Sequence, residues 1–146
     1  MGVLAMARHL RILLIEDNPI RIKKFRFWVP SDVILVEARS AGQAMGFLKR
    51  IQPGELAGLL LDHDLHQQAL TSNDLQLSGS DLVNLILRFV DSNVAILVHS
   101  MNPIGAENMA SKLEKGGFWV TRTPMAQMDR AVFENWINEV KELHED

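Results

Sequence analysis

Five short apolar runs, separated by longer amphipathic stretches, constrain the fold of this chain most strongly. They begin near Ile12, Val33, Leu59, Val94 and Phe118. Short continuous apolar runs are typical of parallel strands that helices cover on both faces. Their alternation with helical patterns predicts an α/β fold with a doubly wound parallel sheet. The length of 146 residues predicts that residues 1–146 form a single domain.

Capping and breaking residues predict where the helices lie between these runs. Asn18 followed by Pro19 is typical of a helix start, and Ser40 is a suitable cap for the next helix. The basic residues of the first helix, Arg21 among them, are expected on a solvated face. Residues 99–105 are expected to form a sharply turned loop. The expected helices cover residues 19–28, 41–51, about 78–90, 106–115 and about 128–143.

The amino-acid composition limits which kinds of site and which classes of partner this chain can have. The chain has no cysteine, which excludes disulfides and thiolate sites and leaves oxygen ligands and imidazole for any metal. The formal net charge is -3 and most basic residues are scattered, so broad nucleic-acid binding is not indicated. No apolar run approaches the roughly 18 to 20 residues of a membrane span, so we expect no membrane partner and, by default, a cytoplasmic location.

Acidic residues follow two of the predicted strands. Glu16 and Asp17 follow the first strand, and Asp62 and Asp64 follow the third. In a parallel sheet these positions meet at the carboxyl edge, where carboxylates facing one cleft repel each other unless a cation is bound. Such a set suits Mg²⁺ or Mn²⁺. In the structural alternative the second pair lies in a solvated turn and Asp17 helps Asn18 to cap a helix, but two acidic pairs favour the metal.

Imidazole, hydroxyl and amide groups lie at the same edge. His63 stands between the two aspartates, and His99, Ser100 and Asn102 follow the fourth strand. Ser100 and Asn102 are candidates for binding phosphate oxygens, and either histidine is a candidate for proton transfer. The alternative is that Ser100 satisfies backbone groups while His99 packs against a helix. The residues alone leave both interpretations open.

The order of these residues resembles the receiver domain of response regulators over residues 11–143. The resemblance implies a sheet of order 2-1-3-4-5, a metal pair at Glu16 and Asp17, a phosphoacceptor at Asp62 and a phosphoryl contact at Ser100. Receivers usually place a lysine directly before a proline after the fifth strand. Here that position holds Thr123, so the role of the lysine is either vacant or taken by Arg122, the nearest cation and a candidate for binding phosphate.

Two further motifs, LDHDL and HSMNPIGAENM, are similar to the divergent cyclic-phosphate processing branch of receivers. Residues 63–78 form an insertion relative to ordinary receivers, in a position where it could cover the site. The branch implies a metal-dependent phosphoesterase acting on a small phosphorylated ligand such as a cyclic phosphate or nucleotide. The alternatives are a stand-alone phosphoacceptor with a histidine kinase or other signalling partner, and a degenerate receiver that only binds.

Overall fold

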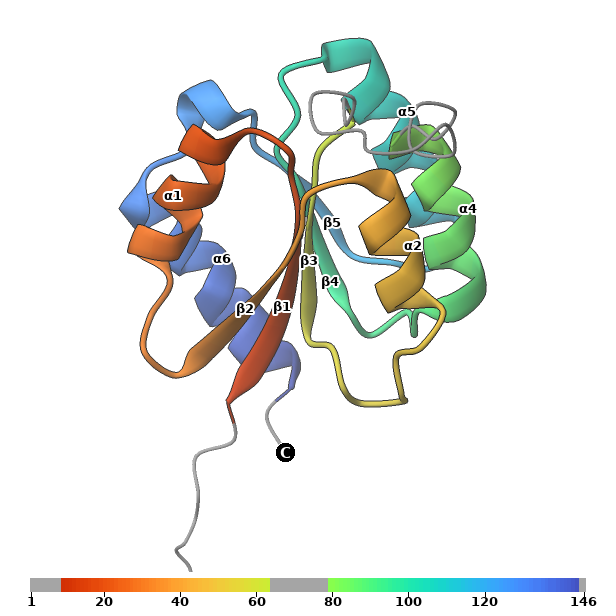
Figure 1. Cartoon of the computed structure of the whole chain (residues 1–146), viewed down its shortest axis with the longest axis horizontal. Coiled ribbons are helices and arrows are strands. Elements are labelled where there is room, and N and C mark those ends of the chain that lie inside the picture. Colours follow the sequence, from red (N-terminus) through yellow and green to blue (C-terminus); the bar gives the residue numbers. More distant parts are fainter. Residues whose placement is uncertain (1–8, 64–78, 145–146) are drawn as a thin grey trace, which may run out of the picture.

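The computed structural model describes residues 9–63 and 79–144 (Figure 1). Its strands are β1 (Leu10–Ile15), β2 (Val33–Ala38), β3 (Gly58–Leu61), β4 (Ala95–Val98) and β5 (Val120–Arg122). Its helices are α1 (Pro19–Trp28), α2 (Ala41–Leu48), α4 (Gly79–Phe89), α5 (Pro103–Lys115), the short 3-10 helix η1 (Met125–Gln127) and α6 (Arg130–Leu143). Asp64 and the rest of the predicted insertion after His63 lie outside the described residues. Within these ranges, no helix has the length and apolar character needed to cross a membrane.

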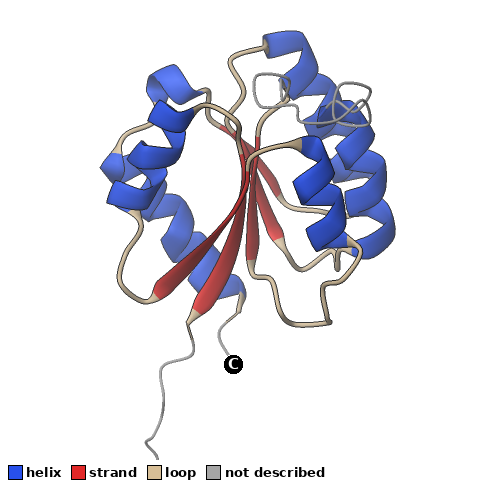
Figure 2. Ribbon diagram, viewed as in Figure 1, coloured by secondary structure: helices blue, strands red, loops and turns tan. Residues whose placement is uncertain are grey.

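The five strands form a parallel sheet in the order β2-β1-β3-β4-β5. Helices α1 and α6 cover one face, and α2, α4 and α5 cover the other (Figure 2). The predicted α/β fold and strand order are therefore confirmed. The order changes direction between β1 and β3, and ligands of doubly wound sheets bind beside such a point at the carboxyl ends of the strands.

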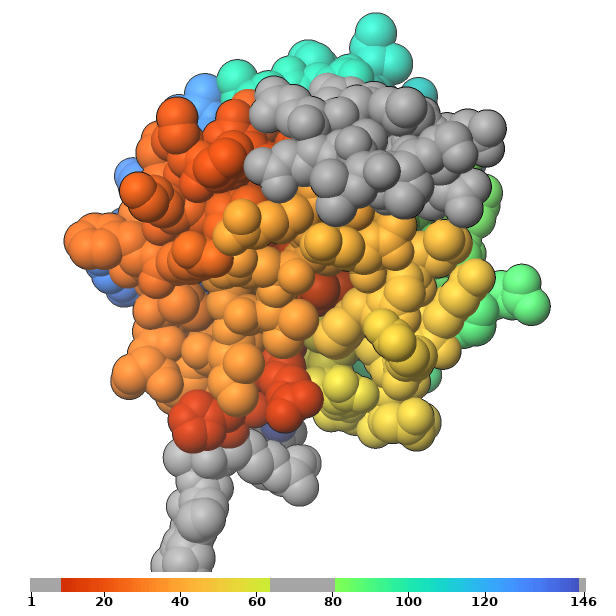
Figure 3. All heavy atoms as spheres, in the orientation of Figure 1, coloured from red at the N-terminus to blue at the C-terminus, as the bar shows by residue number. Residues whose placement is uncertain are grey.

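Alternation along the central strands divides their side chains between two cores. Leu13 and Ile15 pack with α2, α4 and α5, whereas Ile12 and Leu14 pack with α1 and α6. In Figure 3 the orange atoms of the segments from α1 through α2 occupy much of the face that is shown. A fully buried leucine or isoleucine contributes roughly 1.5–3 kcal/mol, so a register shift that exchanged the two faces would be costly.

Two helix ends differ from the expected ones by three residues: α2 ends at Leu48 instead of residue 51, and α5 begins at Pro103 instead of residue 106. The side chain of Asn102 accepts a hydrogen bond of 3.0 Å from the backbone nitrogen of Gly105, and Pro103 occupies the first helical position. Both features favour a helix start at this point. Part of the expected loop at 99–105 is therefore helical, and the cap engages the side-chain oxygen of Asn102.

Candidate functional site

The register of the three central strands determines which polar residues meet. Leu14, Leu60 and Leu97 lie side by side and all pack on the α1 and α6 face. Because side chains alternate along a strand, the residues two positions further on point to the same face. Those residues are Glu16, Asp62 and His99. Three separate segments thus deliver two carboxylates and an imidazole to one point.

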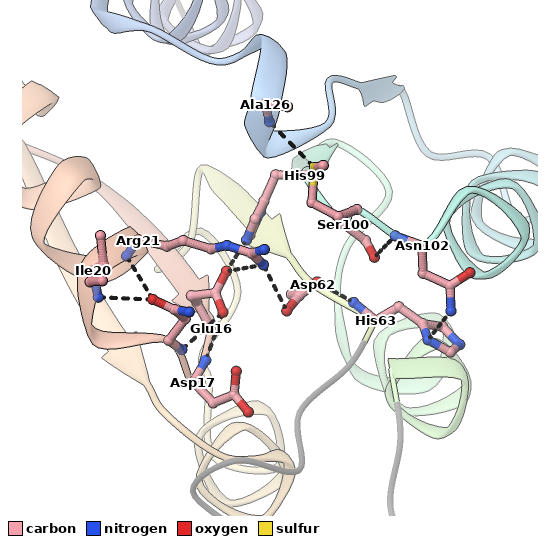
Figure 4. A network of polar contacts seen from close by, with 12 residues as sticks. Glu16, Asp17, Ile20, Arg21, Asp62, His63, His99, Ser100, Asn102 and Ala126 are labelled. Carbon is pink, nitrogen blue, oxygen red and sulfur yellow. Dashed lines mark hydrogen bonds and ion pairs between the residues drawn. The ribbon is translucent and has the colours of Figure 1, made fainter.

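These three residues form a buried cluster. Glu16 and His99 are fully buried and Asp62 is 2% exposed. One ligand atom from each lies within 4.8 Å of the other two. The Nε2 atom of His99 is 2.9 Å from Oε1 of Glu16 (Figure 4), and the ring of Phe25 packs edge-on against the imidazole at 5.1 Å between centroids. The Nδ1 atom of His99 is buried and has no hydrogen-bond partner among the described residues.

Glu16 is held in place by both of its carboxylate oxygens. Its Oε2 atom accepts hydrogen bonds of 3.0 Å from the backbone nitrogens of Asp17 and Asn18, while Oε1 faces His99. Burial acts to raise the pKa of Glu16, but the hydrogen bond and the charge of His99, with the Asn18 nitrogen and Arg21, outweigh it and lower the pKa. Of Glu16 and Asp62, Glu16 is therefore the carboxyl group that ionises at the lower pH.

For Asp62, the effects that raise the pKa outweigh those that lower it. Burial, followed by the charge of Glu16, raises its pKa from 3.8 to about 6, although His99, Arg21 and the hydrogen bond from the His63 nitrogen act against this. That nitrogen donates to Oδ1 of Asp62 at 2.9 Å. This hydrogen bond fixes the orientation of the Asp62 carboxylate, but the negative charge of the carboxylate is only partly neutralised. A further cation beside it would be stabilising.

Arg21 reaches this cluster from the first turn of α1. Its Nη1 atom is 3.6 Å from Oε1 of Glu16 and 3.7 Å from Oδ2 of Asp62, and its side chain is 27% exposed. The expectation that the basic residues of α1 lie on a solvated face is therefore wrong for Arg21. A signal was present, because helical side chains lean toward the N-terminus and α1 begins directly beside Glu16.

The other candidate residues belong to the opposite side of the sheet. The ring of His63 packs on α5 so closely that a Cβ atom at Gly105 would lie 2.6 Å from it. The Nδ1 atom of His63 is 3.4 Å from Nδ2 of Asn102, whose backbone nitrogen donates to Oγ of Ser100 at 3.1 Å. In Figure 4 the carboxylate of Asp17 lies farther from the guanidinium of Arg21 than those of Glu16 and Asp62 do. His63, Ser100 and Asn102 thus form a second polar group beside the acidic cluster.

A comparison with protein families identifies the chain. The sequence profile of the cyclic-phosphate processing receiver domain matches residues 11–115, which is more than half of the chain. The chain belongs to this family of receivers. A comparison with the curated proteins finds no match.

Solved receivers of low sequence identity share this receiver's fold. The signal receiver domain of an HD domain-containing protein from Pseudomonas fluorescens Pf-5 has a TM-score of 0.69 and 16% identity, covering 99% of this chain and 96% of that one. The response regulator domain of CheB from Thermotoga maritima has a TM-score of 0.66 and 14% identity, covering 95% and 99%. The receiver domain of sensor histidine kinase PA1611 from Pseudomonas aeruginosa PAO1, solved with magnesium in its active-site cleft, has a TM-score of 0.62 and 17% identity, covering 89% and 95%.

The acidic cluster of this receiver fits a phosphoacceptor or a metal site. Two buried carboxylates and an imidazole within 4.8 Å are a suitable donor set. Carboxylates suit Mg²⁺ and Mn²⁺, whereas imidazole suits transition ions. Because His99 already faces Glu16, it is placed to orient that carboxylate, as residues behind metal ligands commonly do.

Arg122 lies on a different face from Asp62. It is exposed at the end of β5, in register with Val98 of β4. Val98 and Val120 pack with α5, and alternation places Arg122 on that same face. The phosphate-binding role expected of Arg122 stays a prediction, as does the metal-binding role of Asp64, which lies outside the described residues. Among the residues that the structure describes, the arginine that pairs with Asp62 is Arg21.

Proposed function

We propose that this receiver binds a divalent cation, Mg²⁺ or Mn²⁺, through Asp62 with Glu16, Asp17 and Asp64, and that it hydrolyses cyclic phosphates. The observation that carries the proposal is the burial of Glu16 and Asp62 within 4.8 Å of each other and of His99. Two carboxylates so placed favour binding of a cation. The family match and the two extra histidines support cyclic phosphates as the ligand class.

In the proposed reaction, water attacks the phosphorus atom and the bond to one ester oxygen breaks. The phosphate keeps the attacking oxygen, and the leaving oxygen takes up a proton. The cation, when bound, would polarise a phosphoryl oxygen. The hydroxyl of Ser100 and the amide nitrogen of Asn102 would bind phosphate oxygens, with Arg122 available from β5. His63 is part-buried beside Asn102 and would move the proton.

The position of His99 in the sequence makes it a candidate for proton transfer, but in this proposal it has a different role. Its side chain is fully buried, and its Nε2 atom is directed at Glu16. Direct contact with a ligand would require the packing against Phe25 to open. We therefore assign His99 to positioning Glu16, and His63 to proton transfer.

The test combines metal binding with turnover. Calorimetric titration with Mg²⁺ and Mn²⁺ should show binding that Asp62→Asn weakens. The protein should then release product from one or more members of a panel of 2′,3′- and 3′,5′-cyclic phosphates only when the metal is present. His63→Gln should lower kcat, whereas His9→Gln, a matched change at an exposed histidine before β1, should not. Metal binding without turnover of any cyclic phosphate would refute the hydrolase.

A second candidate function is phosphoacceptance by Asp62. It is favoured by the orientation of His63, whose ring packs on α5 and not on the acidic cluster. Of the residues of the LDHDL motif that the structure describes, only Asp62 belongs to that cluster. In this reaction an oxygen of Asp62 would form a bond to the phosphorus of a donor, and the bond to the donor's leaving group would break. A histidine kinase would be the natural partner.

The two functions differ in whether phosphate accumulates on the protein. After incubation with acetyl phosphate and Mg²⁺, intact-mass measurement should show one added phosphoryl group on the wild type and none on Asp62→Asn. A stable phosphorylated form without turnover of cyclic phosphates would support the phosphoacceptor. An unchanged mass under these conditions would count against it.

A further inference from the structure

Arg21 occupies the space between the two carboxylates at distances that suit attraction but not a direct hydrogen bond. Its Nη1 atom is 3.6 Å from Glu16 and 3.7 Å from Asp62. In Figure 4 the guanidinium lies between these two carboxylates. A divalent ion bound to the same oxygens would bring two cations close together in a largely buried site. Their repulsion would push the more mobile one, Arg21, outward.

A groove beside the cluster offers Arg21 another position. It has a volume of about 270 Å³ and lies between the start of α1 and η1. Arg21 and Lys24 both line it, and Met101 forms part of its apolar wall. Residues three apart on a helix lie on the same face, so Arg21 and Lys24 present two positive charges to one groove. Arg21 thus borders the acidic cluster on one side and this groove on the other.

We propose that Arg21 is a displaceable cation, which neutralises Glu16 and Asp62 when no metal is bound and turns to bind the ligand's phosphate once the metal is in place. Arg21 would thereby supply a positive charge in a receiver whose usual lysine position holds Thr123. This inference rests on the proposed metal site. It adds two properties to that site: Arg21 competes with the metal for the carboxylates, and metal binding is coupled to phosphate binding. A site formed by the acidic cluster alone would need neither property.

The inference predicts opposite effects on two binding constants. Because Arg21 competes with the metal, Arg21→Gln should bind Mn²⁺ alone more tightly than the wild type, by about fivefold or more. Because Arg21 also binds phosphate, the same variant should lose most of the factor by which inorganic phosphate tightens Mn²⁺ binding. Coupling between two ligands is reciprocal, so a titration of phosphate at fixed Mn²⁺ should give the same factor.

The experiment is a set of calorimetric Mn²⁺ titrations with and without inorganic phosphate. Arg21→Lys keeps the charge and should retain the weaker metal affinity of the wild type. This variant therefore separates the effect of the charge on metal binding from any effect of a substitution on folding. Lys23→Gln, an equal charge change on the exposed side of α1, should leave both constants within about twofold. If Arg21→Gln binds Mn²⁺ like the wild type, this inference is wrong while the metal site stands. If the wild type binds no Mn²⁺, both proposals fall.

Discussion

Replacing Asp62 with asparagine should make the metal-free protein more stable. In the folded protein the pKa of Asp62 is raised from 3.8 to about 6, chiefly by burial and then by the charge of Glu16. At neutral pH the ionised carboxylate is therefore held in a place that favours its protonated form. Asparagine resembles that protonated form in shape, and its side-chain oxygen can still accept the hydrogen bond from the His63 nitrogen.

The size and the pH dependence of this effect follow from the change in pKa. Each step of one in pKa is worth about 1.4 kcal/mol, so the wild type should lose about 3 kcal/mol of stability above pH 7 relative to the protonated form. Since the folded pKa is raised, the contribution of Asp62 is fully present below about pH 4 and is lost as the pH rises through about 6. The advantage of Asp62→Asn should therefore vanish in acid.

Thermal unfolding in EDTA at pH 4, 6 and 8 measures this prediction. For a chain of this length, 3 kcal/mol corresponds to about 10 °C in Tm, in favour of Asp62→Asn at pH 8. Asp91→Asn, at an exposed aspartate, serves as the control and should change Tm little. Added Mg²⁺ or Mn²⁺ should raise the Tm of the wild type more than that of Asp62→Asn. A variant that is less stable than the wild type in EDTA at pH 8 would refute the reasoning.

Substitutions at three further positions probe the packing around the sheet and the site. Gly58→Ala should destabilise by about 1–3 kcal/mol in urea unfolding, because the new Cβ would lie 2.9 Å from the ring of Trp136; an unchanged midpoint would contradict this. Asn102→Ala should cost about 1 kcal/mol through loss of the α5 cap, and Asn102→Asp should recover most of it by the same measurement. Gly105→Ala should displace the ring of His63, seen as a shift of its imidazole NMR signals, with a smaller effect on Tm than Gly58→Ala.

The elements of this fold could be predicted well because each carries a local signal. Apolar runs mark all five strands, and Asn18 and Ser40 cap α1 and α2 as expected. The start of α5 differs from the expectation because the asparagine, proline and glycine after β4 suit a turned loop as well as a helix start. Asn102 and Pro103 instead form the same cap-and-proline start as Asn18 and Pro19. The start of α5 thus carries a local signal of the same kind as the start of α1.

The candidate site was predicted less completely. The acidic residues and His99 can be found because they directly follow apolar strands, but Arg21, expected on a solvated face, pairs with Glu16 and Asp62. Its ion pairs depend on how α1 lies against the ends of β1 and β3, which helical periodicity does not specify. The pKa values of Glu16 and Asp62 likewise move in opposite directions because His99, with the Asn18 nitrogen and Arg21, outweighs burial at Glu16, whereas burial and the charge of Glu16 prevail at Asp62.

The sequence by itself determined the strands, the strand ends that carry polar residues, and the alternation that turns Asp62 and His63 to opposite faces. These are properties of short segments and of backbone geometry. The tertiary structure decided the register, which aligns Leu14, Leu60 and Leu97 and so brings together Glu16, Asp62 and His99 from positions far apart in the chain. It also decided that Arg21 lies across these carboxylates, because that contact depends on packing between elements and not on the preferences of either one.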